Sequence, residues 1–187
     1  IVMDYLKTKA PFWKRETTTH GERWIGIAPF AAHNGKMYPK EKMEEVVKVL
    51  STEYSNLRIF FFGGGKEEKQ ILNTWATKYK GCTCASEVLH GLNEELVLIS
   101  HLDTMISMDS ANMHLASLVG TRVVSIWGAT HPYCGFLGWN QKEDDAVQNT
   151  KLECRPCSVF GNKPCHRGDF ECMYSIAPSA IIERLHL

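Results

Sequence analysis

The sequence has no excess of charge of either sign and no apolar run long enough to cross a bilayer. Its 187 residues include 21 Lys and Arg against 21 Asp and Glu. A nucleic-acid-binding protein normally shows a surplus of basic residues on at least one segment, and none is present, so we expect no nucleic-acid partner. The chain also lacks a secretory signal, internal repeats and low-complexity tracts. These absences favour a cytoplasmic globular protein.

What is present suits one good-sized domain. Hydrophobic residues make up 44% of the chain and aromatic residues 10%, enough to form a core. The first residue is Ile1, and the early segment is polar with weak periodicity, as if a domain had been excised from a longer chain. We therefore expect residues 1–22 to be a linker or the remnant of an interdomain segment, and residues 23–187 to form the domain.

Hydrophobic periodicity predicts alternating strands and helices over most of the chain. Strands are expected at residues 23–28, 57–62, 103–108 and 122–127. Helices are expected after Pro39, after the glycines at 63–65, and at residues 92–100, 111–119 and 176–187. After Gly128 the pattern breaks into a loop and a cysteine-rich segment. This alternation predicts an α/β fold, with a Rossmann-like parallel sheet and helices on both faces.

Three of the predicted strands end in polar or glycine-rich turns, where open α/β sheets bind their ligands. Asp109 or Ser110 can cap the helix that follows, leaving free N–H groups for an anion, and His114 lies one helical turn further on. The glycines at 63–65 allow close approach of a ligand, and a carboxylate just after them could bind ribose hydroxyls. Lys36 precedes a helix and could neutralise a diphosphate.

Each of these features also has an ordinary structural explanation. They could be an N-cap with a buried histidine, a flexible turn with solvated charges, and a surface lysine. The glycine turn is not a Walker loop, because no Gly-Lys-Ser/Thr follows. We expect all three features at the same edge of the sheet. Their proximity there leads us to predict that a phosphorylated ligand binds at the turn from Asp109 to His114.

Four motifs occur in a distinctive order. They are Lys36-x-Tyr-Pro, Gly-Gly-Gly-x-Glu, Asp109-Ser110-x-x-Met113-His114-Leu115-Ala116 and Trp127-Gly128-x-Thr130-x-Pro132. This order resembles the C-terminal half of glycosyltransferase family 9, which contains the ADP-heptose:lipopolysaccharide heptosyltransferases. The resemblance runs from about Trp24 to the C-terminus, including the cysteine-rich tail. It implies the donor-binding domain of a two-domain GT-B enzyme.

The resemblance also implies a set of donor-binding residues. They are Lys36, Glu67, Asp109, Ser110, Ala111, Met113, His114 and Thr130. Lys36, His114 and the helix N-terminus would stabilise the departing diphosphate without a metal or other cofactor. No catalytic residue is expected here, since the general base would lie on the N-terminal domain. Ala31, Ala32 and Ala111 depart from the family pattern and bear on the identity of the donor.

The implied function is transfer of a sugar, most simply from ADP-heptose, to a lipopolysaccharide-core or related saccharide or lipid-linked acceptor. The acceptor would bind the absent N-terminal domain, so this chain alone would be inactive. The resemblance implies work at the cytoplasmic face of a bacterial inner membrane, which allows peripheral membrane association. One alternative is another nucleotide-sugar enzyme, such as an epimerase or a GT-B transferase using a UDP- or GDP-sugar.

A zinc-containing interaction module is an alternative of a different class. Cys154, Cys157, Cys165 and Cys172 could form a Cys₄ site, but the second pair is more widely spaced than in a zinc ribbon. Free thiols that brace a loop, or a single disulfide, are the favoured interpretation.

Overall fold

A computed structural model describes residues 21–187, so the linker predicted at residues 1–22 falls almost wholly outside the described residues. The chain forms a six-stranded parallel sheet in the order β3-β2-β1-β4-β5-β6. The strands are β1 (Arg23–Ala28), β2 (Leu57–Phe61), β3 (Cys82–Cys84), β4 (Thr104–Met108), β5 (Val123–Trp127) and β6 (Ala146–Gln148). The α-helices are α2 (Lys40–Glu53), α3 (Lys66–Lys78), α4 (Leu92–Ser100), α5 (Ala111–Leu118), α6 (Glu171–Tyr174) and α7 (Pro178–Glu183).

The strand order reverses at β1, which lies between β2 and β4. Ile27 on β1 is in register with Phe61 on one side and with Ile106 on the other. The loops that follow β1 and β4 therefore leave the sheet towards opposite faces, which opens a crevice between them. Such a switch point is the usual ligand-binding place in this kind of sheet.

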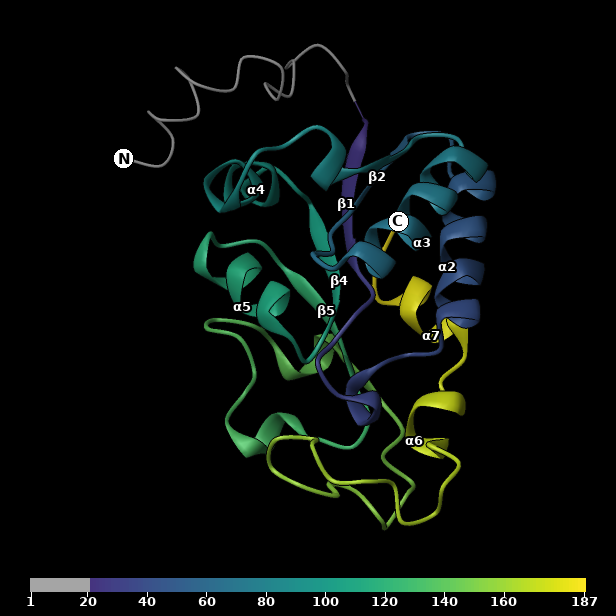
Figure 1. Cartoon of the computed structure of the whole chain (residues 1–187), viewed down its shortest axis with the longest axis vertical. Helices are drawn as coiled ribbons and strands as arrows, with labels where there is room; N and C mark the ends of the chain where they lie inside the picture. Colours follow the sequence, from purple (N-terminus) through teal and green to yellow (C-terminus); the bar gives the residue numbers. More distant parts are fainter. Residues whose placement is uncertain (1–20) are drawn as a thin grey trace.

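The helices cover both faces of the sheet, as the sequence predicted (Figure 1). On one face, α2, α3 and α7 bury side chains that include Val47, Trp75 and Ile181 against the strands. On the other face, α4 and α5 do the same with Leu98 and Met113. Alternate residues of each strand supply the two cores, which fixes the sheet between the helix layers.

Two edge strands and one short helix were not predicted. Strands β3 and β6 have three residues each and α6 has four, which is too short for hydrophobic periodicity to reveal them. Among the described residues, no helix is both long and apolar enough to cross a membrane.

Candidate functional site

A cavity of about 590 Å³ lies beyond the carboxyl ends of β1, β2 and β4, at the switch point of the sheet. Its lining comes from the turn after each of these strands and from two later loops. The lining residues are Phe30, Ala31, Ala32, His33, Lys36, Phe62, Gly63, Gly64, Glu68, Asp109, Ser110, Ala111, Asn112, His114, Phe136 and Phe160. Lys36, Asp109, Ser110, Ala111 and His114 are thus brought together, as the sequence predicted.

A buried ion pair forms one wall of this cavity. The ammonium of Lys36 lies 2.9 Å from the carboxylate of Asp109, and the two side chains are only 13% and 4% exposed. The hydroxyl of Thr130 donates to the same carboxylate oxygen at 2.8 Å. Asp109 thereby fixes the position of the ammonium, which keeps further N–H donors for a ligand.

The N-terminus of α5 points into the site without a side-chain cap. The sequence predicted a cap from Asp109 or Ser110, and this was wrong for Ser110, the N-cap residue, which makes no capping hydrogen bond. Its hydroxyl instead lies 3.2 Å from that of Ser107, while Asp109 is engaged by Lys36 and Thr130. The first N–H groups of α5 therefore remain uncapped by these side chains, which suits an anion.

The carboxylate at the glycine turn belongs to Glu68, one residue after the predicted Glu67. Glu68 accepts hydrogen bonds from the backbone N–H groups of Gly64, at 2.9 Å, and Gly65, at 3.3 Å. It occupies the third position of α3, from which a side chain reaches back over the helix start. Glu67 is exposed and lines a neighbouring cavity of about 600 Å³ instead.

Two other predicted site residues do not line the 590 Å³ cavity. Met113 is fully buried in the core between α5 and the sheet. Thr130 is also fully buried and reaches the site only through Asp109. His114 is exposed on the cavity side of α5, since it lies one turn after Ser110.

Sequence reasoning missed the wall formed by the segments after β5. The rings of Phe136 and Phe160 lie 5.7 Å apart at their centroids, and the Lys36 ammonium lies 5.6 Å from the ring centre of Phe136. Gly161 packs on the stem of Lys36, where a Cβ would come within 2.7 Å of Lys36 Cε. The loops that carry these residues have no periodicity, so only their aromatic residues could have drawn attention.

Arg155, in the cysteine-rich segment, braces the loops that support the site. Its guanidinium donates to the backbone carbonyls of Gly128, Thr130 and Asn149 at 2.7–2.9 Å, and to the side chain of Gln148 at 3.0 Å. Burial lowers the pKa of Arg155 from its ordinary value. The segment thus holds Thr130, and through it Asp109, in place.

The structure gives no support to the zinc alternative. All seven cysteines are free. Within residues 21–187, no group of three or more His, Cys, Asp or Glu side chains is placed to hold a metal ion.

The thiols should differ widely in reactivity. Burial raises the pKa of Cys82 to about 12. At Cys165 burial also acts to raise the pKa, but hydrogen bonds from the backbone of residues 167–170 outweigh it and lower the pKa. Since the thiolate is the nucleophile, Cys165 should react with iodoacetamide well before Cys82 at pH 7.5. Peptide mass spectrometry after timed labelling measures this order, and faster labelling of Cys82 would contradict it.

The fold and the site together define a class of protein. They describe a Rossmann-like α/β domain, the fold found in GT-B glycosyltransferases, with a polar cavity at its switch point that contains the Lys36 ammonium and the uncapped start of α5. The chain belongs to glycosyltransferase family 9 (heptosyltransferase), whose model matches residues 2–164. The resemblance inferred from the four motifs is therefore confirmed.

Known proteins similar to this chain include two heptosyltransferases. Lipooligosaccharide heptosyltransferase 2 of Campylobacter jejuni is 27% identical over 187 residues, which cover 96% of this chain and 55% of that protein. The structure of the E. coli ADP-heptose lps heptosyltransferase II matches with a TM-score of 0.65 at 18% identity, covering 91% of this chain and 47% of that one. The chain thus spans about half the length of these two proteins.

A third similarity is short. Over 25 residues, 13% of this chain, the sequence is 88% identical to the molybdopterin synthase catalytic subunit of Haemophilus ducreyi, covering 17% of that protein.

Proposed function

We propose that this chain forms the donor-binding half of a heptosyltransferase and binds ADP-heptose in the 590 Å³ cavity. The observation that carries the proposal is the buried Lys36–Asp109 pair beside the uncapped start of α5. Together these place an ammonium and backbone N–H groups where a diphosphate would lie. In support, the two similar proteins reported above are heptosyltransferases, and one of them is described as an ADP-heptose heptosyltransferase.

In the proposed complex, each part of the donor meets a different group. The diphosphate lies between Lys36 and the start of α5, with His114 one turn further along the helix. The ribose hydroxyls meet the carboxylate of Glu68, whose position is fixed by the glycine turn. Ala31 and Ala32 line the cavity without adding hydroxyl groups, so the phosphates depend all the more on Lys36.

The chemical role of this half is to stabilise the leaving group. As the bond between the sugar and the diphosphate breaks, negative charge grows on the departing oxygen, and fixed cations and N–H donors stabilise it. The attacking hydroxyl of the saccharide acceptor needs a general base. In this proposal the acceptor is a saccharide of the lipopolysaccharide-core type, and both its binding site and the base belong to an N-terminal domain that is not part of these 187 residues.

Titration calorimetry with ADP, UDP, GDP and ADP-heptose tests the donor. We expect ADP and ADP-heptose to bind more tightly than UDP and GDP. Preference for UDP or GDP would replace ADP-heptose by another nucleotide sugar, and no binding by any of them at millimolar concentration would overturn the donor site.

The two neighbouring glutamates provide a matched pair of variants. Glu68→Gln should weaken ADP binding about tenfold, because a neutral amide oxygen is a weaker acceptor than a carboxylate for both the ribose hydroxyls and the N–H groups of the glycine turn. Glu67→Gln should leave the affinity within about twofold, because Glu67, unlike Glu68, does not line the 590 Å³ cavity. Calorimetry on both variants measures the contrast, and the reverse ranking would assign the ribose to Glu67.

A further inference from the structure

A second pocket lies at the opposite end of the sheet from the donor cavity. It has a volume of about 430 Å³ and is lined by the end of α5, the start of β5 and the segment before β6. Gly120 and Arg122 place it at the amino end of β5, whereas the donor cavity lies at carboxyl ends. The two cavities share no lining residue, so this pocket is not an extension of the donor site.

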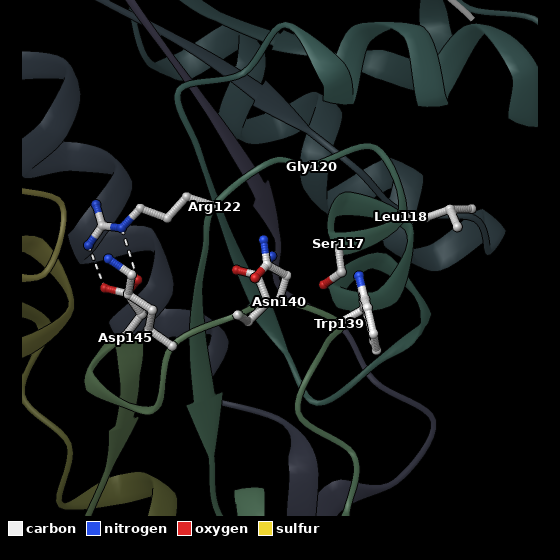
Figure 2. Close-up of a pocket in the computed structure, with 9 residues that line it drawn as sticks. Ser117, Leu118, Gly120, Arg122, Trp139, Asn140 and Asp145 are labelled. Carbon is white, nitrogen blue, oxygen red and sulfur yellow. Dashed lines mark hydrogen bonds and ion pairs between the residues drawn. The ribbon is translucent and has the colours of Figure 1, made fainter. Parts of the chain in front are cut away.

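The walls of this pocket are held rigidly. Gln141 accepts a hydrogen bond from the backbone of Val123 at 2.7 Å and donates to the carbonyl of Thr121 at 3.0 Å. The guanidinium of Arg122 makes two hydrogen bonds with the carboxylate of Asp145 (Figure 2). The loop therefore needs no large rearrangement to receive a ligand.

Two apolar side chains of the pocket are turned to solvent. Trp139 is 85% exposed and Leu118 is 74% exposed. Figure 2 shows these two on one side of the pocket and the Arg122–Asp145 pair on the other, with Asn140 between them. An exposed indole presents a flat apolar face next to hydrogen-bonding groups, which is an arrangement suited to amphipathic rings.

The charges of the pocket indicate which ring would fit. Arg122 and Lys142 contribute two positive charges and Asp145 one negative charge, so the lining has a net charge of +1. Because Arg122 is paired with Asp145 and also donates to the carbonyl of Arg184, this net charge resides on Lys142. The carboxylates of Glu143 and Asp144 are adjacent in sequence but do not line the pocket. A neutral or cationic ring would gain no electrostatic attraction from this positive charge, whereas an anionic substituent would be attracted to it.

We propose that this pocket binds a saccharide carrying an anionic substituent, of the sugar-phosphate class. The apolar face of the sugar ring stacks on Trp139, and the amide of Asn140 hydrogen-bonds a ring hydroxyl. The ammonium of Lys142 pairs with the phosphate, while the guanidinium of Arg122 stays bound to Asp145. The inference does not rest on the donor site, because no residue is common to both.

The probes are glucose 6-phosphate, glucose and inorganic phosphate, titrated into this chain at constant ionic strength. We expect glucose 6-phosphate to bind at least tenfold more tightly than either of the others and to shift the indole N–H resonance of Trp139, assigned with Trp139→Phe. Trp139→Ala should raise the Kd for glucose 6-phosphate about tenfold, as expected for truncation of a central aromatic contact. Lys142→Gln should raise it about threefold and leave glucose unaffected.

Tyr133→Ala is the matched control, since Tyr133 is an aromatic residue of 78% exposure that does not line the pocket. It should leave the Kd unchanged, and thermal unfolding should show that all the variants fold like the parent. Equal affinity of Trp139→Ala and Tyr133→Ala for glucose 6-phosphate would overturn the proposal. So would binding that shifts no Trp139 resonance, or phosphate binding as tightly as its sugar ester.

Discussion

Replacing Lys36 by methionine should lower the free energy of unfolding by about 3 kcal/mol and reduce ADP affinity by a factor of about 100. The stability loss arises because Asp109 is only 4% exposed and would keep a buried charge whose partner has been removed. The affinity loss arises because the same ammonium is proposed to contact the diphosphate. Chemical denaturation measures the first effect and titration calorimetry the second.

A double variant separates these two effects. Lys36→Met with Asp109→Asn removes both charges, and the new amide oxygen can still accept the hydrogen bond from Thr130. We expect most of the stability to return while ADP binding stays weak. Lys40→Met is the control for loss of a lysine, since Lys40 is 63% exposed and its ammonium lies 3.9 Å from the exposed carboxylate of Glu41. Recovery of ADP binding in the double variant would show that Lys36 serves the fold and not the ligand.

The parts of the fold that the sequence predicted are those with long periodic patterns. Met43, Val46, Val47 and Leu50 recur at helical spacing, and all four are fully buried on α2. Their burial depends only on which face of a helix they share, so neighbours in sequence are enough to predict it. The switch-point cavity was predicted on the same basis, because carboxyl ends of parallel strands meet at one edge.

The features that local sequence patterns could not resolve depend on contacts between distant residues or on register. Whether Glu67 or Glu68 lines the 590 Å³ cavity depends on the residue at which α3 begins, and a shift of one position rotates a helical side chain by about 100°. Met113 belongs to the family motif, but a motif does not distinguish a residue that contacts a ligand from one that packs beneath it. Phe136 and Phe160 are in contact although 24 positions separate them in sequence, a contact that no local pattern can reveal.

The cysteine-rich segment, whose structure the sequence did not predict, also positions residues of the site. Arg155 connects the loop after β5 with the loop after β6, and its carbonyl partners include that of Thr130. Thr130 in turn donates to Asp109, which fixes Lys36. A chain of polar contacts thus runs from the cysteine-rich segment to the proposed diphosphate site, although neither Arg155 nor Thr130 lines the cavity.

Arg155→Leu should therefore lower the free energy of unfolding by about 3 kcal/mol or more, because each buried acceptor left without a donor costs about 1–3 kcal/mol. ADP affinity should fall as well, since Thr130 would lose its support. Arg155→Lys should recover only part of the stability, because a single ammonium cannot reach carbonyls on two loops at once.

Arg167→Leu, which removes an exposed arginine of the same segment, should change the melting temperature little. Equal melting temperatures for Arg155→Leu and Arg167→Leu would show that the brace does not stabilise the fold. Normal stability with weakened ADP binding would instead assign Arg155 to the ligand.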